Sequence, residues 1–287
     1  MKILILSMGM SPNSQALIEE ALKAGHEINF FLYKDLVFNF QSKKMEILIK
    51  EEKNINKYNV IILRSPKYFA PHVRCVVYMA RKLGIYVLNQ DMVLSEFSPN
   101  KLSQHTILAL HGLPVLKTAL PMGQGNFKKA FKKIKPPIIL KGITGSLGAH
   151  VYKVESHQKA YGLLKKYGLG NLLFQEFAPA RQDYRILVLD DQPLGVMRRI
   201  APPSDFRANI ARGGKGEKAK LTAEMSKLAK KAAQLLKCEF CGVDIMYWQG
   251  KPYILEVNLF PQFSGFTQAT KINVAQKIIK YLEKKVR

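Results

Sequence analysis

Three side chains with oxygen ligands could hold a hard metal ion. Asp244 lies in one apolar segment, and Glu256 and Asn258 lie in the next. Because side chains alternate between the faces of a strand, Glu256 and Asn258 share one face, and Leu255 and Val257 face the core. Magnesium needs few carboxylates when phosphate oxygens and water supply its other ligands. The spacing predicts a magnesium–nucleotide site, although each residue alone is more typical of the solvent-facing side of an antiparallel sheet.

A lysine followed by a glycine-rich loop could bind the phosphates of that nucleotide. Residues 136–141 form a short apolar strand that ends in Lys141, and residues 142–148 are small and rich in glycine. Glycines let backbone amides approach phosphate oxygens, and the lysine adds a point charge. The loop is not a Walker A motif, since no Gly-Lys-Ser/Thr sequence follows the glycines. A plain turn is the alternative.

Further motifs accompany these two segments in a fixed order along the chain. They are Lys141 with Gly145-Ser146-Leu147-Gly148, Gln175-Glu176-Phe177, Asp183-Tyr184-Arg185, Asp205-Phe206-Arg207-Ala208-Asn209 with Gly213-Gly214, Gly242-Val243-Asp244-Ile245 and Leu255-Glu256-Val257-Asn258. From about residue 59 to residue 281 the chain resembles the ATP-grasp fold, and within it the RimK-like carboxylate–amine ligases. The resemblance implies an α/β protein with an ATP-grasp fold, in which an N-terminal α/β pre-ATP-grasp domain precedes two α+β lobes that enclose the nucleotide.

The resemblance also implies a role for each matching residue. The implied ATP-binding residues are Lys101, Lys141, Gly145, Ser146, Gly148, Glu176, Phe177, Asp183, Arg207 and Asn209. Glu176 and Phe177 would meet the adenine, and the loop from Gly145 to Gly148 would cover the phosphates. The implied ligands of magnesium or manganese are Asp244, Glu256 and Asn258. The implied catalytic residues are Lys141, Arg199 and Arg207, and either Arg199 or its neighbour Arg198 would hold an acyl phosphate.

Some of these positions have simpler interpretations. Lys101 could be one solvated lysine among many. Asp183 and Arg185 lie two residues apart, on one face if this stretch is extended, and could form a surface ion pair of little energetic value.

The chain departs from the family pattern at three positions. Gly142 replaces the usual proline after the lysine, and His150 replaces a glycine at the end of the loop. After the metal strand, Gln262 replaces the glycine of Asn-x-x-Pro-Gly. We therefore expect a looser lid and an acceptor pocket reshaped by residues 262–264, so the usual amino-acid acceptor is not assumed. A degenerate ATP-binding scaffold is an alternative, against which the intact metal trio argues.

The chain is strongly basic. Among 287 residues it has 45 lysines and arginines against 21 acidic residues, a formal net charge of +24. This excess is beyond what solubility requires and favours an acidic carboxylate-bearing peptide, protein or metabolite as partner. Much of the charge is clustered at Lys128, Lys129, Lys132, Lys133 and Lys135, and at Lys227, Lys230 and Lys231. A general bias toward lysine is the alternative.

The elements that position these residues can be predicted from hydrophobic periodicity. Strands are expected at 2–6, 60–63 and 85–88, and helices at 14–23 and 73–83. Their alternation indicates a small parallel sheet, and so an α/β domain over residues 1–95. Arg64 follows the second of these strands, at the end where open α/β sheets bind ligands. We expect a small ATP-covering lobe over residues 96–178 and a large lobe with the metal site over residues 179–287.

Cysteine content and hydropathy indicate the cellular compartment of the protein. Cys75, Cys238 and Cys241 are too few for a disulfide framework and lack the partners of a zinc site, so we expect reduced core thiols. The sequence contains no apolar run that could span a membrane, and its first residues lack the features of a signal peptide. We therefore expect a cytoplasmic protein.

Together the motifs predict an ATP-dependent, ADP-forming ligase. A carboxylate is a poor acylating agent, so ATP converts it to an acyl phosphate, which an amine then attacks to form an amide. No protein nucleophile is needed, in agreement with the absence of a nucleophile motif. The resemblance makes the amine an amino acid, often glutamate.

Two other classes of function remain open. A phosphotransferase of the same fold would use a hydroxyl acceptor and release ADP without free phosphate. A nucleic-acid-binding protein would draw only on the basic charge, and the sequence lacks a stacking motif or a recognised module for it. The oligomeric state is open, and a homo-oligomer is compatible with the sequence.

Overall fold

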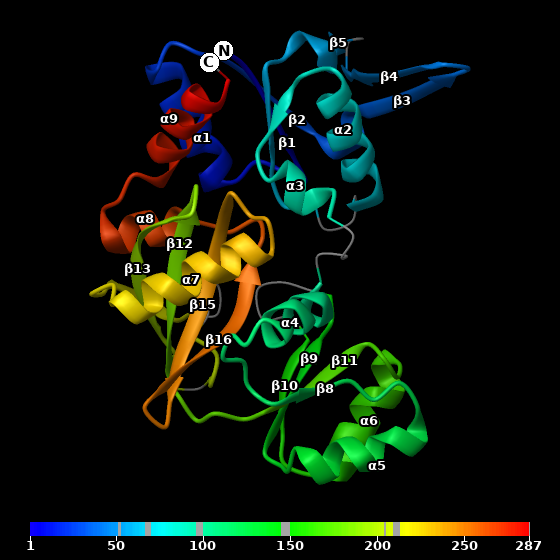
Figure 1. The fold of residues 1–287 in the computed structure, drawn as a ribbon, viewed down its shortest axis with the longest axis vertical. Coiled ribbons are helices and arrows are strands. Elements are labelled where there is room, and N and C mark those ends of the chain that lie inside the picture. The colour runs from blue at the N-terminus through cyan, green and yellow to red at the C-terminus, as the bar shows by residue number, and fades with distance from the viewer. Residues whose placement is uncertain are drawn as a thin grey trace.

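The structure is a computed structural model that describes residues 1–50, 53–66, 70–95, 100–144, 150–203, 205–208 and 213–286. Figure 1 shows the three larger of the four sheets stacked along the long axis of the molecule, each with its own helices. The N-terminal sheet is at the top, the sheet within residues 118–176, called the second sheet below, is at the bottom, and the third, within residues 182–258, lies between them. The mixed α/β class expected from the sequence is therefore present.

Alternating strands and helices build the N-terminal sheet. Strands β1 (Lys2–Ser7), β2 (Glu27–Leu32), β6 (Val60–Leu63) and β7 (Tyr86–Val87) pair in parallel in the order β2-β1-β6-β7. Helix α1 (Pro12–Lys23) begins after Ser11, whose side chain accepts a hydrogen bond from the Ser14 backbone. The parallel order confirms the small parallel sheet predicted from the alternation.

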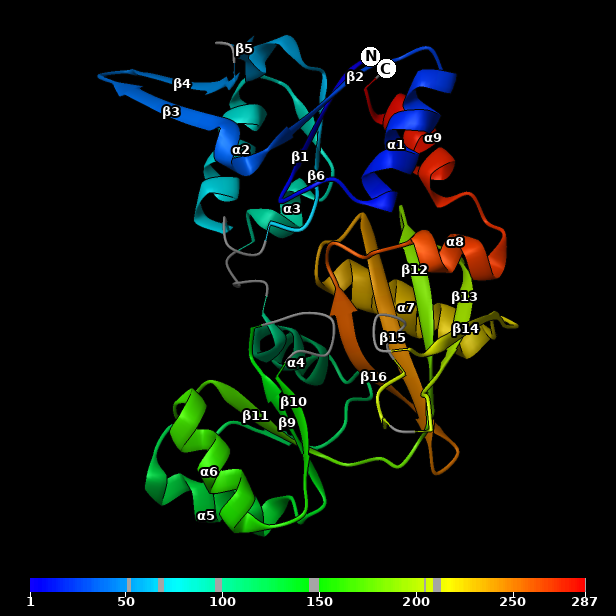
Figure 2. The same cartoon turned by 180° about the vertical axis from the view of Figure 1, so that it is seen from behind.

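Helices cover both faces of this sheet. Helix α2 (Ala70–Lys82) packs with α3 (Gln90–Val93) on one face. Helix α9 (Val274–Lys285) lies beside α1 on the other, where Ile278 and Leu282 share a core with Ile3 and Ile5. Figure 2 shows the two helices side by side. A helix from the segment 179–287 thus completes the core of the N-terminal sheet.

A small three-stranded antiparallel sheet that the periodicity analysis does not identify projects from the N-terminal part (Figure 1). Its strands are β3 (Leu36–Gln41), β4 (Lys44–Ile49) and β5 (Lys53–Asn54), with short 3₁₀ helices at Tyr33–Asp35 and Ile55–Lys57 on either side. Ile47 and Ile49 anchor it in the core, whereas Phe40 near its tip is 73% exposed. Its apolar side chains are therefore buried at the base and exposed near the tip.

The second sheet has two different faces. Its strands are β8 (Thr118–Ala119), β9 (Ile138–Gly142), β10 (Val151–Val154) and β11 (Leu172–Glu176), in the order β10-β9-β11-β8. Helices α5 (Gln124–Lys133) and α6 (His157–Tyr167) pack on one face through buried Leu140 and Phe174. Because side chains alternate, Ile139, Lys141 and Gln175 face the opposite side and line a pocket.

The third sheet is antiparallel. Its strands are β12 (Gln182–Leu189), β13 (Gln192–Ile200), β14 (Lys215–Lys218), β15 (Phe240–Trp248) and β16 (Lys251–Asn258), in the order β14-β13-β12-β15-β16. Helix α7 (Ala223–Leu235) packs against the sheet through buried alanines, and α8 (Ser264–Thr270) contacts β13 and β14. Helix α4 (Lys101–Leu110) contacts β16 and α7, and so connects the second and third parts.

Strand β16 departs from the regular alternation predicted for it. Asp244 lies opposite Glu256, but Ile245 lies opposite Ile254, so Leu255 is the extra residue of a β-bulge. Leu255 and Glu256 consequently both line the pocket. The prediction that Leu255 faces the core is therefore wrong, whereas Val257 is buried as predicted.

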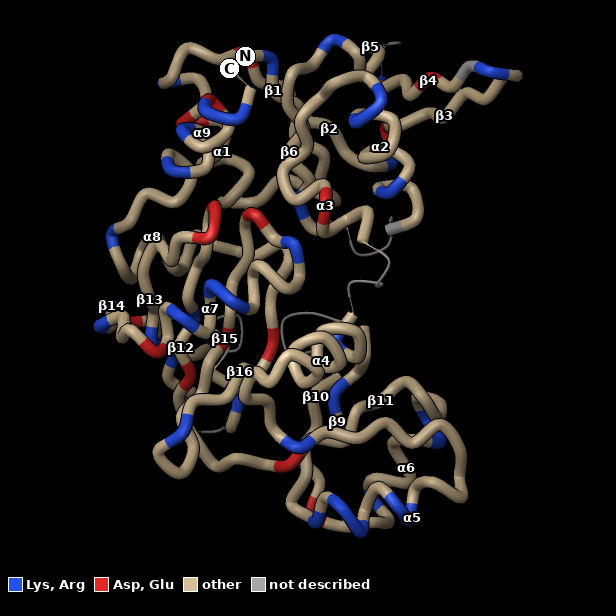
Figure 3. The backbone as a smooth tube through the Cα atoms, in the orientation of Figure 1, with Lys and Arg blue, Asp and Glu red and all other residues tan. Residues whose placement is uncertain are grey.

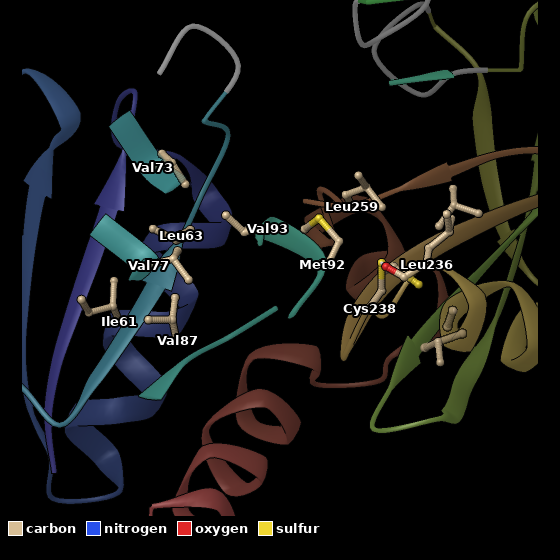
Figure 4. Close-up of a cluster of buried hydrophobic side chains, with 14 of the residues drawn as sticks. Ile61, Leu63, Val73, Val77, Val87, Met92, Val93, Leu236, Cys238 and Leu259 are labelled. Carbon is tan, nitrogen blue, oxygen red and sulfur yellow. The ribbon is translucent and has the colours of Figure 1, made fainter. Parts of the chain in front are cut away.

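The N-terminal and third sheets share one apolar cluster. Figure 4 shows Val77 and Val87 of the N-terminal part in the same cluster as Met92, Leu259 and Cys238. Polar contacts accompany it: the Asn89 side chain donates to the carbonyls of Phe240 and Leu259, at 2.7 and 3.1 Å. The two sheets are therefore joined by packing and by hydrogen bonds.

The cysteines do not all occupy the core. Cys238 and Cys241 are buried as expected, but Cys75 is exposed on α2, so that part of the prediction is wrong. Of the helices that the structure describes, none combines the length and hydrophobicity needed to cross a membrane.

The close packing of β15 against the end of β16 gives a stability prediction. A Cβ on Gly242 would lie 3.2 Å from Pro261 Cβ and 3.3 Å from Leu187 Cδ2, whereas Gly162, in the exposed part of α6, has open space. We expect Gly242→Ala to lower the free energy of unfolding by about 1–3 kcal/mol through overpacking. Gly162→Ala should raise it by roughly 0.5–1 kcal/mol, because alanine favours the helix. Urea unfolding of both variants measures the two changes, and equal signs would contradict this account.

Candidate nucleotide and metal site

A pocket lies between the facing sides of the second and third sheets. Among the residues that line it are Lys101, Lys141, Glu176, Phe177, Asp183, Arg199, Arg207, Asp244 and Glu256, all of which the sequence motifs single out. Asn258 is adjacent, because its side chain nitrogen lies 3.2 Å from Asp244 Oδ2 and 3.4 Å from Glu256 Oε1. Segments far apart in the sequence are thus brought to one cavity.

Charged residues of opposite sign face one another across the strands of the third sheet. Asp183 lies opposite Arg199, and Arg185 lies opposite Asp244. Asp244 in turn lies opposite Glu256. Opposed positions on neighbouring strands bring side chains into contact, so this register places two Asp–Arg pairs and the two acidic residues Asp244 and Glu256 on the floor of the pocket.

Arg199 bridges the two buried aspartates. Its Nε donates to Asp183 Oδ1 at 2.5 Å, and its Nη2 lies 2.8 Å from Asp244 Oδ2. Arg185 donates from Nε and Nη2 to the two oxygens of Asp244, each at 2.7 Å. The predicted surface ion pair between Asp183 and Arg185 is therefore wrong, because Asp183 is buried and pairs with Arg199, whereas Arg185 pairs with Asp244. Of the two neighbouring arginines, Arg199 lines the pocket, whereas Arg198 is partly exposed and pairs with Glu217.

Burial and the arginines act in opposite directions on the two aspartates. Although burial opposes it, Arg185 and Arg199 hold the pKa of Asp244 below its usual value. Burial raises the pKa of Asp183, whose direct partner Arg199 is shared with Asp244. Asp244 is consequently ionised at neutral pH and suited to hold a cation.

Asp244, Glu256 and Asn258 fit a hard divalent cation. Their side chains converge and offer only oxygen donors if the Asn258 amide presents its oxygen. The described residues contain no group of three or more His, Cys, Asp or Glu side chains that could hold a metal unaided. A set of two carboxylates and one amide therefore relies on phosphate oxygens and water, which is the preference of magnesium.

Lys141 faces these carboxylates with no ion pair of its own among the described residues. Lys101, in contrast, holds its Nζ 3.8 Å from Glu256 Oε2. Burial lowers the pKa of Lys141. Because a buried ammonium group without a partner is costly, this position suits an anionic ligand, and a phosphate oxygen has the required charge.

Helix α4 ties the parts of the site together. Asn100 caps it by accepting a hydrogen bond from the Ser103 backbone. The Lys101 backbone donates to the Ile143 carbonyl at 3.0 Å, at the root of the glycine-rich loop. Three residues on, Gln104 Oε1 accepts a hydrogen bond from the Val257 backbone of β16 at 3.1 Å. The helix therefore contacts both the root of the glycine-rich loop and strand β16.

His105 links this helix to the second sheet. Its Nδ1 lies 3.0 Å from the Lys101 carbonyl, and its Nε2 lies 3.0 Å from Gln175 Nε2, which also donates to Thr118. An amide nitrogen can only donate, so His105 is neutral with its proton on Nδ1. Burial, followed by the nearby charge of Lys141, lowers the pKa of His105 to about 4. His105 therefore adds no third positive charge beside Lys101 and Lys141 at neutral pH.

Glu176 and Phe177 stand at the pocket edge where β11 ends. Glu176 exchanges hydrogen bonds with the Lys117 backbone, donating from its own backbone at 3.0 Å and accepting at Oε1 at 2.8 Å. The Phe177 ring lies 6.2 Å from the Phe206 ring and 4.8 Å from Lys153 Nζ. An aromatic surface beside a strand end suits a planar base, so the adenine role stays a well-placed prediction.

Arg207 reaches from the third part of the molecule to the second. Its Nε and Nη2 donate to the Asp205 carboxylate, and its Nη1 donates to the Val151 carbonyl at 3.2 Å. The hydrogen bond from Arg207 lowers the pKa of Asp205. The guanidinium is therefore held in a fixed orientation beside the first residue of β10.

Two departures from the family pattern meet at the base of the glycine-rich loop. The Gly142 backbone donates to the His150 carbonyl at 2.9 Å, and His150 has a left-handed backbone with φ of 55°. This conformation explains why glycine is usual at position 150. A Cβ on Gly142 would lie 2.8 Å from the Thr144 carbonyl and 3.2 Å from His150 Cβ. The glycine at 142 therefore makes room for the side chain at 150. The predicted contacts of Gly145, Ser146, Gly148 and Asn209 lie outside the described residues.

Two family models together match most of the chain. Residues 98–282 match the RimK-like ATP-grasp domain, and residues 1–93 match the RimK PreATP-grasp domain. The chain belongs to the RimK-like ATP-grasp family. At this level it is an ATP-grasp ligase, and the family and the fold inferred from the sequence motifs are confirmed.

Likeness to individual RimK-like and other ATP-grasp proteins extends over the whole chain. A probable alpha-L-glutamate ligase of Legionella pneumophila (strain Corby) is 28% identical over 293 residues, which cover 100% of this chain and 97% of that protein. The ATP-grasp ligase PsnB, solved with a phosphomimetic variant of its minimal precursor, Mg and ADP, has a TM-score of 0.76 at 18% identity and covers 99% of this chain and 98% of PsnB. The D-cycloserine synthetase DcsG has a TM-score of 0.75 at 14% identity, with 100% of both chains covered.

Some residues of this RimK-like site have no role in the sequence-based prediction. Arg185 is in a quoted motif but is assigned to the wrong partner, and His105 and Gln104 are not considered. Their spacing contains a usable signal: His105 follows Lys101 by four residues, so both occupy one face of α4. The partner of Arg185 depends on strand register, which spacing within one strand does not reveal.

The buried neutral His105 gives a pH prediction. Its pKa is about 4 in the folded chain and near the ordinary value of 6.5 when unfolded. The unfolded chain therefore binds the extra proton first, and the folded state should lose about 3 kcal/mol as pH falls from about 6.5 to about 4. This part of the loss should vanish in His105→Gln, as measured by urea unfolding at several pH values. His111→Gln serves as the control, because His111 is exposed on the same helix and makes the same contact with a backbone carbonyl. Identical pH dependence in wild type and His105→Gln would contradict the assignment.

Proposed function

We propose that this chain is an ATP- and magnesium-dependent carboxylate–amine ligase that forms an amide through an acyl phosphate. The amine is an amino acid, with L-glutamate as the first candidate. The acyl substrate is an acidic peptide, protein or small carboxylate. The carrying observation is the half-buried Lys141, which faces the carboxylates of Asp244 and Glu256 across a pocket and has no ion pair of its own among the described residues.

Opposite charges on the two walls of the pocket suit a metal-bound nucleotide. The wall of the second sheet offers Lys141, and helix α4 adds Lys101; the wall of the third sheet offers Asp244 and Glu256. Phosphates can bind the lysines, and magnesium, held by Asp244, Glu256 and Asn258, would neutralise charge on the transferred phosphoryl group. ADP and Mg are named in the PsnB complex, which has the same fold. Manganese would fit the same donors.

The first chemical step activates the carboxylate. Its oxygen attacks the terminal phosphorus of ATP, the bond to the leaving ADP oxygen breaks, and an acyl phosphate remains. Lys141 and Arg207 stabilise negative charge on the phosphoryl oxygens, and Arg199 is placed to hold the acyl phosphate. The Asp205 carboxylate fixes the Arg207 side chain, so little reorganisation is needed at this step.

The second step forms the amide. A neutral amine attacks the acyl carbon, phosphate leaves with its electron pair, and the amine loses a proton to solvent or phosphate. Overall, ATP, a carboxylate and an ammonium group give an amide, ADP, phosphate and a proton. Water would destroy the acyl phosphate, so the apolar side chains of Leu116, Ile139 and Met246 around the pocket have a protective role.

The relatives support the choice of substrates. Proteins named as probable alpha-L-glutamate ligases align over nearly the whole chain, and PsnB was solved with its minimal precursor. Glutamate as amine and a peptide as acyl substrate are therefore the first pair to test. A phosphotransferase would transfer the phosphoryl group to a hydroxyl and would release no free phosphate.

Product analysis tests the proposed reaction. With ATP, magnesium, L-glutamate and a pool of acidic peptides, we expect a peptide mass increase of one glutamate less water, with ADP and phosphate formed in equal amounts. Glu256→Gln should lower this turnover at least about 100-fold, because it weakens the hold on the magnesium ion that would neutralise the transferred phosphate. The matched control is Glu217→Gln on the same sheet, whose carboxylate pairs with partly exposed Arg198 at 2.6 Å and should be dispensable. A phosphorylated product without phosphate release would instead identify a phosphotransferase.

A lysine patch on helix α5 gives a prediction about the acyl substrate. Lys128, Lys129, Lys132 and Lys133 are exposed, and α5 lies on the outer face of the second sheet, away from the pocket (Figure 3). This position suits a long acidic acceptor with a second contact point. The second-order rate for such an acceptor should fall as salt rises from about 0.05 to about 0.5 M, because charge attraction is screened beyond about 8 Å.

Neutralising the α5 patch tests whether the position of these lysines, and not only the total charge of the protein, affects the use of an acidic acceptor. Changing its four lysines to glutamine should slow use of a long acidic peptide but leave the affinity for ATP unchanged. The comparison set is Lys227, Lys230 and Lys231, which are exposed on α7. If neither salt nor the α5 substitutions change the rate, the acyl substrate is a small metabolite and the patch reflects a general bias toward lysine.

A further inference from the structure

Arg64 is a buried cation without an anionic partner among the described residues. It directly follows β6 and is 3% exposed. Burial lowers the pKa of Arg64 to about 10, so the group is still charged at neutral pH. Since moving an ion out of water is costly, buried arginines are normally paired with carboxylates. The absence of a pair in the described part of the chain indicates that something else needs this charge.

The guanidinium has donor capacity to spare. Its Nη2 donates to the Pro261 carbonyl at 2.7 Å, and its central carbon lies 5.5 Å from the centre of the Phe263 ring. Its Nε is fully buried, and the described residues offer it no hydrogen-bond acceptor. An arginine presents its N–H groups as a planar fork that matches a carboxylate. The Nε–H group of this fork is therefore left unpaired by the described residues.

Neutral side chains already hold the loop that Arg64 contacts. Asn13 Oδ1 accepts hydrogen bonds from the backbones of Phe263 and Ser264, at 2.6 and 2.8 Å. At the other end of the loop, the Asn89 amide donates to the Leu259 carbonyl at 3.1 Å. Both ends are thus fixed without any charge. A buried guanidinium is not needed for that task.

The surroundings of Arg64 are those of a ligand site. It stands at the carboxyl end of β6, beside that of β1, and ligands bind at this edge in open parallel sheets. The next residue, Ser65, has a φ of 47°, a strained value that is frequent at functional sites. Its Oγ lies 3.3 Å from Nε2 of the exposed Gln262, which is long for a hydrogen bond. Met8, on the loop after β1, is 40% exposed.

This edge adjoins the metal strand. Pro261, the residue that Arg64 contacts, follows Asn258 by three positions. We propose that Arg64 binds a carboxylate of one substrate at this edge, with Ser65 and Gln262 as neutral partners that exchange their long mutual hydrogen bond for the ligand. The inference rests on the proposed function and adds a subsite to it. The carboxylate that Arg64 holds is one that does not react, and it belongs either to the amino acid or to the acidic acyl substrate.

Steady-state kinetics with matched variants tests the subsite. Arg64→Met removes the charge and keeps the apolar stem, and Arg64→Lys keeps the charge without the fork. At saturating ATP and magnesium, KM is measured for L-glutamate and separately for an acidic peptide. We expect Arg64→Met to raise one of these two KM values at least about tenfold, the usual effect of losing a charge-assisted hydrogen bond, with the KM for ATP unchanged. Arg64→Lys should recover part of the loss.

The source of the carboxylate follows from which KM changes. If the KM for L-glutamate rises, L-glutamine and L-isoglutamine, which lack one carboxylate each, identify the group that Arg64 holds. If the KM for the peptide rises, the acyl substrate supplies it. The melting temperature of Arg64→Met should be equal to or above that of wild type, since an unpaired buried charge is gone. Arg74→Met is the control, because Arg74 also donates to backbone carbonyls but is itself exposed on the surface of α2.

A structural role would give a different result. If Arg64 only braces the loop, Arg64→Met should behave like Asn89→Ala, which removes the support at the other end of the loop, with a lower melting temperature and unchanged KM values. The subsite would also be overturned if Arg64→Met were insoluble and Arg64→Lys had wild-type KM values. If the wild type forms no amide with any amino acid, the proposed function fails. In that case the role of Arg64 is tested by calorimetry. The affinities for L-glutamate and for the peptide are measured with wild type and with Arg64→Lys, and equal affinities in the two proteins would overturn the subsite.

Discussion

Asp244 can be buried as an ion only because Arg185 and Arg199 neutralise it. Desolvation alone would favour the protonated acid, which binds no metal. The two arginines come from the neighbouring strands β12 and β13, so the charge state of one side chain depends on the register of three strands. Because Arg199 also pairs with Asp183, any slip of β12 would disturb both aspartates at once. The regular sheet is thus a condition for the chemistry, and not merely its support.

A second constraint is that the two walls of the pocket belong to different sheets. Their relative position is set by helix α4, which donates to the phosphate loop through the Lys101 backbone and accepts from β16 through Gln104. His105 extends this connection to Gln175 of the second sheet while remaining neutral. A charged histidine there would repel Lys141, so burial and hydrogen bonding favour the neutral protonation state of His105.

Motif spacing could predict much of this site because its residues lie near strand ends and within short segments. The position of Lys141 at the end of its strand and the shared face of Glu256 and Asn258 follow from local patterns within one strand. The role of Leu255 could not be predicted, because a bulge reverses the alternation and depends on pairing with β15. The partner of Arg185 likewise depends on register. The left-handed backbone at His150 is a local feature, yet only its contact with Gly142 explains why both positions depart from the family pattern together.

The position of helix α9 has a consequence for biosynthesis. The face of the N-terminal sheet formed by Ile3 and Ile5 is covered in part by Ile278 and Leu282, which the ribosome adds only after both nucleotide-binding lobes. Until then this apolar face is incompletely covered, and exposed apolar surface of this kind promotes aggregation. The first domain to be translated is therefore among the last to complete its core. An isolated N-terminal fragment would lack a wall of its own interior, so the chain is organised as one folding unit closed by its final helix.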